Sequence, residues 1–282
     1  MSAPGAVVAF LELLNVQPGE RVLEVGTGTG WTAALLTALG AGVTTIEIDP
    51  VIASAADQRL RATGFDAVVL IGDGAEGAPE SGLFGGVHVT CAVTEIPYPW
   101  VEQTRPGGRI VAPWQPEFGD GHKVLLTVTE DGRAIGRLTG TAHYMMLRSQ
   151  RGGFHLPEDT AGAAETGTCL DPRQVTEGGY GADAAIAGML PDVMALPQHE
   201  TGRFELLLAD TGGTSWARVS RTGGAEHHVR QAGPRRLWDE VADAYQRWVG
   251  WGRAERSRFG MTVGQNGHQV IWCDDPTNII TP

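Results

Sequence analysis

Three acidic residues in the first third of the chain, Glu24, Glu47 and Asp73, lie in or directly after short apolar runs. A carboxylate at the end of a strand can accept hydrogen bonds from both hydroxyls of a ribose. Glu47 fits that role, and Asp73 could accept from the amino group of an adenine. The three residues therefore predict a site for a small molecule that contains a nucleoside.

A glycine-rich turn links the first of these acids to the next stretch of chain, in Glu24-Val25-Gly26-Thr27-Gly28-Thr29-Gly30-Trp31. Glycines after a buried strand let the backbone turn tightly and approach a ligand, while the following helix offers free N–H groups. A plain turn between a strand and a helix can look the same. The turn therefore indicates a ligand site only together with the acids.

Two kinds of cofactor are compatible with the turn, because residues 28–33 also satisfy a loose dinucleotide pattern, GxGxxA. In a dinucleotide turn the first glycine closes the strand, which is Gly26, and the third glycine position then falls on Trp31. That bulky side chain would prevent the close packing which the third position allows. Glu24 would repel a pyrophosphate but attract a cationic cofactor, so a cationic cofactor is favoured over NAD.

These residues lie in a stretch that alternates strands with helices, which is typical of a doubly wound α/β fold with a parallel sheet. Ligands bind such sheets at the carboxyl ends of the strands. The expected strands are Arg21 to Val25, Val43 to Ile48, Ala67 to Ile71, Val87 to Cys91 and Arg109 to Ala112. The expected helices are Trp31 to Leu39, Pro50 to Ala62 and Pro99 to Thr104.

The pattern changes after Ala112. Lys123 to Thr129 and Ala134 to Thr139 flank a turn and predict a hairpin that adds antiparallel strands to one edge of the sheet. Residues 149–184 have little periodicity and are expected to form a loop or linker. We therefore divide the chain into a catalytic domain at 1–148, the linker at 149–184, and an α+β extension at 185–282. Within the extension we expect a strand at Phe204 to Ala209, a hairpin around Gly223, a helix from Pro234 to Val249 and a strand pair between Phe259 and Trp272.

The composition excludes several classes of protein. A formal net charge of −12 argues against a partner that is a nucleic acid or an anionic membrane, because both need a positive surface. The three cysteines, Cys91, Cys169 and Cys273, are far apart, so neither a disulfide framework nor a metal site is expected. No apolar run approaches the about 20 residues of a membrane helix. We expect a cytoplasmic protein, and the sequence does not indicate its oligomeric state.

Several short sequence motifs in the first half of the chain resemble the protein-L-isoaspartate O-methyltransferase family of class I methyltransferases. The matching words are Ser2-Ala3-Pro4, Val22 to Trp31, Gly72-Asp73-Gly74, Val89-Thr90-Cys91-Ala92, Ile96-Pro97 and Pro106 to Pro113. The resemblance implies S-adenosylmethionine as the cofactor and places Ser2, as a catalytic residue, beside the methyl acceptor. It also implies these cofactor-binding residues: Glu24, Gly26, Thr27, Gly28, Gly30, Glu47, Ile48, Gly72, Asp73 and Gly74.

The family esterifies a carboxylate of isoaspartate, and the ester then closes to a succinimide. A carboxylate has a pKa of about 4 and is already ionised at neutral pH, so it can attack a methyl group on sulfur without a general base. The enzyme must supply alignment and exclude water. The partner implied by the resemblance is a peptide or protein that carries an aspartate or isoaspartate.

The sequence departs from the family in three places. The chain begins almost at Ser2-Ala3-Pro4, where family members usually have a preceding helical segment, so either a segment is missing or part of the pocket is built differently. The usual acid ahead of the fourth strand is replaced by Phe84-Gly85-Gly86-Val87. The region after about Gln150 is longer than a repair enzyme normally needs.

Such extensions occur in relatives that act on ribosomally made, modified peptides and convert an aspartate to an aspartimide. That substrate class is favoured here, with general isoaspartate repair and an NAD-dependent oxidoreductase as alternatives. The aromatic residues of the extension could grip such a peptide or could form an ordinary core. They are Trp216, Trp238, Tyr245, Trp248, Trp251 and Trp272.

Overall fold

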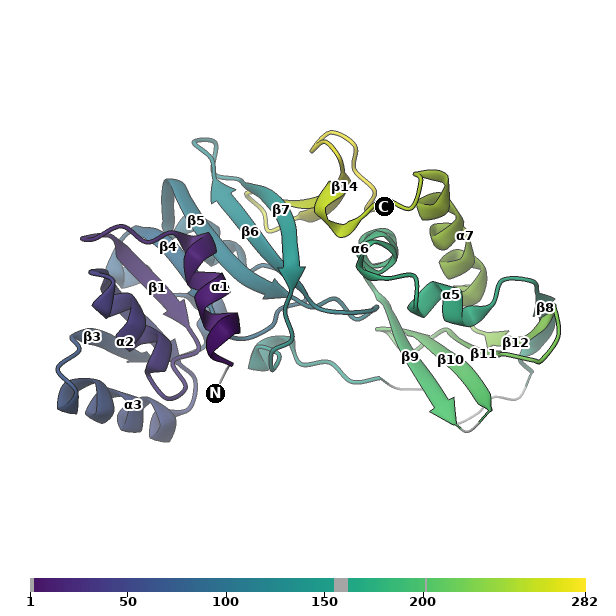
Figure 1. Cartoon of the computed structure of the whole chain (residues 1–282), viewed down its shortest axis with the longest axis horizontal. Coiled ribbons are helices and arrows are strands. Elements are labelled where there is room, and N and C mark those ends of the chain that lie inside the picture. The colour runs from purple at the N-terminus through teal and green to yellow at the C-terminus, as the bar shows by residue number, and fades with distance from the viewer. Residues whose placement is uncertain (1–2, 155–161, 201) are drawn as a thin grey trace. The chain divides into compact units, whose positions relative to one another are not determined.

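The computed structural model describes residues 3–154, 162–200 and 202–282. Ser2 lies outside the described residues. The chain divides into two compact units. Figure 1 shows the whole chain, coloured from purple at the N-terminus to yellow at the C-terminus. The first comprises Met1–Gln115, Gly121–Arg151 and Gly260–Val270, and the second comprises Pro116–Asp120, Gly152–Phe259 and Ile271–Pro282.

A nine-stranded sheet has the order β14-β13-β7-β6-β5-β4-β1-β2-β3, and its strands lie in the first unit except for Phe259 of β13 and residues 271–273 of β14. Strands β1 to β5 are mutually parallel where they pair, whereas β6, β7 and β13 add antiparallel pairs at one edge. This confirms the predicted doubly wound fold with an antiparallel hairpin. The strands are β1 (Arg21–Val25), β2 (Gly42–Glu47), β3 (Ala67–Ile71), β4 (Phe84–Val89), β5 (Thr104–Trp114), β6 (His122–Val128), β7 (Ala134–Thr141), β13 (Phe259–Val263) and β14 (Gln269–Cys273).

The last strand pair was expected in the extension, but β13 pairs with β7 of the first unit. Gly260 lies opposite Arg137, and Val263 lies opposite Ala134. The sequence shows where strands begin and end, but not which edge they join, because pairing depends on the path of the whole chain. The first unit therefore includes residues far beyond the predicted boundary at 148, namely Gly260–Val270.

Four helices belong to the first unit: α1 (Pro4–Leu14), α2 (Trp31–Ala38), α3 (Pro50–Ala62) and α4 (Tyr98–Glu102). The start of α3 follows the expected chemistry, because Pro50 occupies the first turn and the Asp49 carboxylate accepts from the N–H groups of Val51 and Ile52. We did not predict α1. Its sequence is almost entirely apolar and has no clear polar face, so its helical period was hidden.

Helices α1, α2 and α3 share one apolar core with the sheet. Phe10 and Leu14 of α1, Leu36 of α2 and Leu60 of α3 are buried in the same cluster. Each buried side chain of this kind contributes about 1.5–3 kcal/mol by removing its surface from water. This core fixes the helices against the strands whose carboxyl ends form the site described below.

The second unit contains a five-stranded antiparallel sheet in the order β8-β12-β11-β10-β9. Its strands are β8 (Ala164–Thr168), β9 (Val193–Glu200), β10 (Arg203–Asp210), β11 (Trp216–Ser220) and β12 (His227–Ala232). Its helices are α5 (Pro172–Thr176), α6 (Tyr180–Met189) and α7 (Leu237–Gly250). Short 3₁₀ helices in the two units are η1 (Gly74–Glu76), η2 (Pro79–Ser81), η3 (Arg148–Gln150) and η4 (Arg256–Arg258).

The prediction of a loop at 149–184 is wrong for much of that stretch, which contains β8, α5 and the start of α6. Strand β8 pairs only with β12 and carries small or exposed residues, so it lacks an apolar alternation. Helix α6 is rich in Ala and Gly and is buried from Gly181 to Met189. A helix buried on all sides has no polar face to reveal its period.

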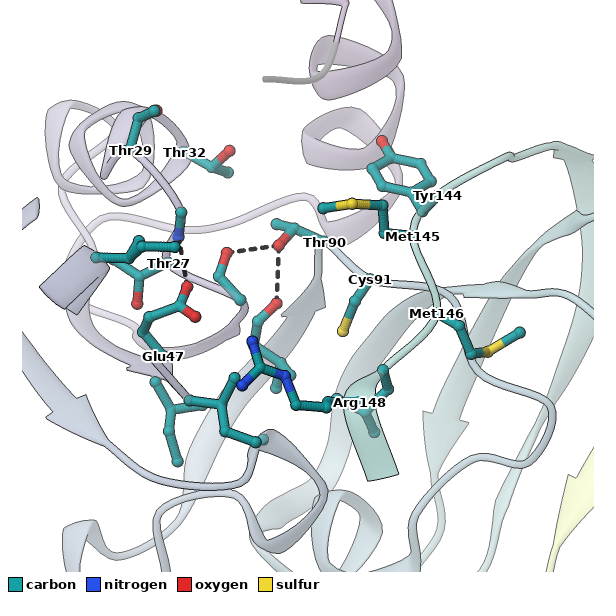
Figure 2. Close-up of a pocket in the computed structure, with 18 of the residues that line it drawn as sticks. Thr27, Thr29, Thr32, Glu47, Thr90, Cys91, Tyr144, Met145, Met146 and Arg148 are labelled. Atoms are coloured by element: carbon teal, nitrogen blue, oxygen red, sulfur yellow. Dashed lines mark hydrogen bonds between the residues drawn. The ribbon is translucent and has the colours of Figure 1, made fainter. Parts of the chain in front are cut away.

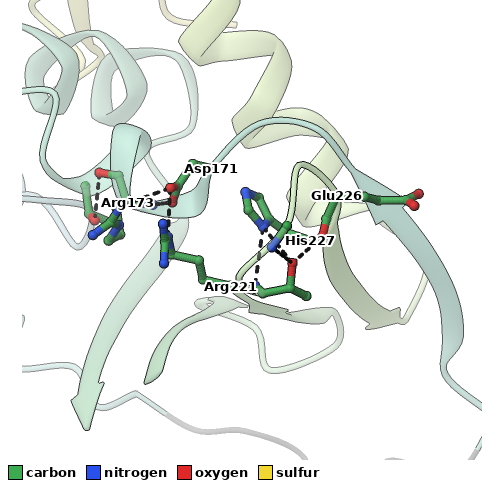
Figure 3. A network of polar contacts seen from close by, with 8 residues as sticks. Asp171, Arg173, Arg221, Glu226 and His227 are labelled. Atoms are coloured by element: carbon green, nitrogen blue, oxygen red, sulfur yellow. Dashed lines mark hydrogen bonds and ion pairs between the residues drawn. The ribbon is translucent and has the colours of Figure 1, made fainter. Parts of the chain in front are cut away.

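A polar network ties α5 to the end of β11 within the second unit (Figure 3). The Asp171 carboxylate caps α5 by accepting from the Arg173 N–H at 3.0 Å, and it pairs with Arg221 Nε at 2.8 Å. Burial alone would raise the pKa of Asp171, but hydrogen bonds from Arg221 and Arg173 outweigh it and bring the pKa to about 2. Asp171 is therefore ionised at any physiological pH and contributes to the stability of this unit.

The aromatic residues of the extension form core rather than a peptide grip. Trp216, Trp238, Trp248 and Trp272 are all less than 5% exposed, and Tyr245 is 5% exposed. Only Trp251 among the six is half-buried. In the part of the chain that the structure describes, no helix is long and apolar enough to span a membrane.

Candidate functional site

A cavity of about 490 Å³ opens at the carboxyl ends of β1, β2 and β4, entirely within the first unit. Strand β1 has β2 on one side and β4 on the other, so the chain leaves β1 where the two halves of the sheet diverge. Open α/β sheets bind ligands at this point. The cavity volume is in the range of sites for small molecules.

The glycine-rich turn forms one wall of the cavity. Gly26, Gly28 and Gly30 have φ angles of 91°, 53° and 82°, a region that favours glycine. A Cβ atom on Gly26 would overlap with Oγ1 of Thr90, whereas a Cβ atom on Gly28 would meet nothing within 4 Å. The first glycine thus permits close packing of the turn, and the second leaves its backbone open towards the cavity.

The Glu47 carboxylate is held at the end of β2 by two backbone donors. The Gly28 N–H donates to Oε2 at 2.9 Å, and the Asp49 N–H donates to Oε1 at 3.2 Å. Figure 2 shows the carboxylate beside the glycine turn. Each oxygen keeps a second lone pair, so Glu47 can still accept from a ligand with two neighbouring hydroxyls.

Asp73 lies in the loop after β3 and faces the same cavity. Its Oδ1 accepts from the Ala75 N–H at 3.0 Å and from the Ser149 hydroxyl at 3.2 Å. The indole Nε1 of Trp100 donates to the Gly74 carbonyl at 2.7 Å and anchors the loop from behind. Asp73 can therefore accept from a ligand amino group without losing its position.

Thr90 and Cys91, directly after β4, also line the cavity, although we had not assigned them roles. The Thr90 hydroxyl donates to the carbonyl oxygens of Val25 and Gly26, at 2.9 Å and 2.5 Å. Burial, with the charges of Glu47 and Asp73, raises the pKa of Cys91 to about 12. The thiol is thus protonated at neutral pH. Their position after a strand was the signal that could have found both residues.

The stretch 143–148 forms the remaining wall, and no sequence motif indicated it. The Ala92 N–H donates to the Met145 carbonyl at 2.9 Å, and the Leu147 N–H donates to the Ala92 carbonyl at 2.7 Å. Tyr144, Met145, Met146 and Arg148 of this stretch border the cavity in Figure 2. Met145 is 80% exposed.

Seven of the ten residues expected to bind the cofactor line the cavity. They are Gly26, Thr27, Gly28, Glu47, Ile48, Asp73 and Gly74. Three do not line it, namely Glu24, Gly30 and Gly72. Ser2, the expected catalytic residue, is outside the described part of the chain.

The three exceptions have structural positions instead. Glu24 is completely buried, and its Oε2 accepts from the Thr45 hydroxyl at 2.6 Å. Gly30 precedes α2, where the space for a Cβ atom is taken by Leu60. The Gly72 N–H donates to the Glu47 carbonyl at 3.0 Å. Glu24 was expected among the cofactor-binding residues, but its carboxylate is buried and does not line the cavity.

The polar groups of the cavity fit S-adenosylmethionine. Glu47 offers two oxygens to a ribose diol, Asp73 offers an oxygen to an adenine amino group, and the open backbone at Gly28 leaves room beside them. Among the described residues, no group of three or more His, Cys, Asp or Glu side chains could hold a metal ion.

Comparison with known proteins agrees with this fit. The model of the family described as Protein-L-isoaspartate(D-aspartate) O-methyltransferase matches residues 1–152. A protein-L-isoaspartate O-methyltransferase of Aeropyrum pernix is 41% identical over 145 residues, which cover 49% of this chain and 54% of that protein. One of Methanopyrus kandleri is 37% identical over 166 residues, covering 56% of this chain and 71% of that protein.

A solved structure titled protein-L-isoaspartate O-methyltransferase has a TM-score of 0.58 and 19% identity, and it covers 98% of this chain and 82% of its own. At this identity the likeness concerns the fold alone. The structural match nevertheless extends through the second unit.

Proposed function

Because the chain belongs to the protein-L-isoaspartate(D-aspartate) O-methyltransferase family, we propose that it transfers a methyl group from S-adenosylmethionine to a carboxylate of an isoaspartyl residue in a peptide or protein. The observation that carries the proposal is the Glu47 carboxylate, fixed by Gly28 and Asp49 at the edge of a cavity that Asp73 also lines. The alignment with the Aeropyrum protein spans about half of that protein's length, so the activity is proposed rather than transferred.

Residues of the chain bind the cofactor and orient it. Glu47 accepts from the ribose hydroxyls, Asp73 accepts from the adenine amino group, and Gly26 and Gly28 give the backbone space next to the ligand. When bound, the cofactor supplies an electrophilic methyl group on a sulfonium. The protonated Cys91 thiol lines the same cavity and, being neutral, is a poor competitor for that methyl group.

The carboxylate that accepts the methyl group must be positioned by the enzyme but does not need to be activated. A carboxylate with a pKa of about 4 is ionised at neutral pH and needs no general base. Arg148 and Arg151 line the cavity and give positive charge that can attract an anionic acceptor. Ser2, by resemblance to the family's Ser-x-Pro segment, donates a hydrogen bond to the acceptor.

The proposal is tested by incubating the protein with S-adenosylmethionine and two short peptides that differ only in one residue, L-isoaspartate or L-aspartate. We expect a mass gain of one methyl group on the isoaspartyl peptide, followed by its loss as a succinimide forms. Asp57→Asn changes a half-buried residue of α3 that pairs with Arg61 and does not line the cavity, and this control is expected to methylate the peptide like the wild type. Absence of methylation on both peptides would contradict the proposal.

A ribosomally made, modified peptide is a second candidate substrate, because residues after 152 lie outside the family match. The product would then be an aspartimide within a constrained peptide. Turnover of the short linear isoaspartyl peptide at a rate equal to that of a cyclised one would argue against this candidate. An oxidoreductase activity is not proposed, since Trp31 occupies the third position of the dinucleotide pattern.

A further inference from the structure

A chain of three side chains connects the interior of the sheet to the cavity wall. The Thr45 hydroxyl donates to Glu24 Oε2 at 2.6 Å, and the hydroxyl oxygens of Thr45 and Thr27 are 2.6 Å apart. Glu24 and Thr45 are register partners on β1 and β2, and Thr27 lines the cavity. Hydrogen bonds therefore link the buried Glu24 carboxyl group to the cavity, although Glu24 does not line it.

The direction of this chain depends on the charge of Glu24, since each hydroxyl has only one proton to donate. With an ionised Glu24, Thr45 donates to the carboxylate and Thr27 donates to Thr45, which leaves Thr27 as an acceptor towards the cavity. With a neutral Glu24, the carboxyl proton can be donated to Thr45, and the Thr27 hydroxyl can then point its proton at the cavity. Only the arrangement with an ionised Glu24 suits a cationic ligand group, because Thr27 then presents a lone pair to the cavity.

The surroundings of Glu24 keep it neutral while the cavity holds no cation. Its side chain is completely buried, and Oε1 has no hydrogen-bond partner among the described residues. Burial raises the pKa of Glu24 to about 8, against the hydrogen bond from Thr45 and with a smaller contribution from the charge of Glu47. At neutral pH the acid is thus mostly protonated.

Among the described residues of the elements packed on β1, none carries a positive charge that would lower the pKa of Glu24. On β4 the register partner of Glu24 is His88, and burial lowers the pKa of His88 to about 4, so that ring is neutral. On β2 the facing charge is that of Glu47, which is negative. Helix α2, which packs on β1, has no ionisable side chain.

We propose that Glu24, Thr45 and Thr27 form a proton-linked positioning relay, in which binding of the cationic cofactor ionises Glu24 and turns the Thr27 hydroxyl into an acceptor. The inference rests on the proposed function. Glu24 is already buried, so the ligand cannot desolvate it further, and the positive charge of the ligand is the change that it senses. The carboxyl proton leaves to solvent as the ligand binds.

The test is a calorimetric titration at pH 7 in buffers of different ionisation enthalpy, which gives the number of protons released per ligand bound. S-adenosylmethionine, with a sulfonium, is compared with S-adenosylhomocysteine, which lacks it. We expect the wild type to release about half a proton or more per S-adenosylmethionine beyond what Glu24→Gln releases. For S-adenosylhomocysteine the difference between the two proteins should be smaller.

Glu24→Gln keeps the shape of the side chain and a hydrogen bond to Thr45 but cannot ionise, so it carries every other protonation effect unchanged. Thr45→Val, which interrupts the relay, is expected to lose most of the extra proton release and serves as the second variant should Glu24→Gln fail to fold. Glu12→Gln, on the exposed side of α1, is the control and should match the wild type.

Equal proton release by wild type, Glu24→Gln and Thr45→Val would overturn the relay while leaving the proposed function intact. A wild-type protein that binds neither ligand would instead contradict the proposed function. The slope of log affinity against pH between pH 6 and 8 gives an independent reading, and it should be steeper for the wild type than for Glu24→Gln.

Discussion

The backbone N–H of Gly28 donates to Oε2 of Glu47 across 2.9 Å, which joins the turn after β1 to the end of β2. This bond fixes the carboxylate at the carboxyl ends of two paired strands. It makes Glu47 a clamp on the glycine turn, in addition to the proposed role of its carboxylate as a ligand acceptor. Replacing the acid should therefore weaken both ligand binding and the fold.

We predict that Glu47→Gln weakens the binding of S-adenosylmethionine by about tenfold to a hundredfold. Hydrogen bonds to a charged group are worth about 1.5–3 kcal/mol, and the amide loses part of that strength. Isothermal titration calorimetry measures the loss, and the melting temperature should fall as well, because the amide nitrogen cannot accept from one of the two backbone donors. Unchanged affinity would show that Glu47 does not contact the ligand.

Gly26→Ala is expected to lower both stability and ligand binding. The substitution places a methyl group against Oγ1 of Thr90 at a φ of 91°, and such strain costs about 1–3 kcal/mol. Gly64→Ala, at a φ of 77° with open space around it, is the control, because it carries the strain without the collision. Thermal unfolding should rank Gly26→Ala well below Gly64→Ala, and equal melting temperatures would count against the packing described for the turn.

Asp171→Asn should destabilise the second unit in a way that depends on pH. The folded-state pKa of about 2 lies below the ordinary value of 3.8, so the stabilisation is present above pH 3.8 and is lost as the pH falls towards 2. After allowance for solvent screening we expect about 1 kcal/mol at pH 7. Denaturant unfolding at pH 7 and pH 3 tests this, and a difference between wild type and variant that does not shrink at the lower pH would contradict it.

Cys91 and Cys169 should react very differently with a thiol-alkylating reagent at pH 8. Cys169 is exposed, whereas burial raises the pKa of Cys91 to about 12, and only the thiolate reacts. Peptide mass spectrometry after brief labelling should find Cys169 modified and Cys91 intact. Faster labelling of Cys91 would mean that its thiol is ionised in the cavity.

The sequence indicated the elements that carry their own start and stop signals. Strands β1 and β3 and helix α3 have the predicted bounds, because Pro50, Asp49 and the glycines punctuate them. Helices α1 and α6 lacked such signals, since the first is almost wholly apolar and the second is buried on all sides. Periodicity identifies a helix only when one face is polar.

The residues of the site also fall into those that the sequence indicated and those that it did not. Glu47 and Asp73 were found because Glu47 ends one parallel strand and Asp73 closely follows the next, and parallel strands end at one edge of the sheet. The stretch around Met145 is held at the cavity by hydrogen bonds with Ala92, far away in sequence. Glu24 was assigned to the ligand from its type and place, but the pleat of β1 directs its side chain into the core.

The most direct test of the cavity as the cofactor site is a titration of the wild-type protein, Glu47→Ala and Asp73→Ala with S-adenosylmethionine. NADH is titrated in the same way as the alternative ligand. We predict saturable binding of one S-adenosylmethionine per chain, marked weakening in both variants, and no binding of NADH. Binding of NADH, or S-adenosylmethionine affinity that neither variant reduces, would contradict the assignment of the cavity at the ends of β1, β2 and β4.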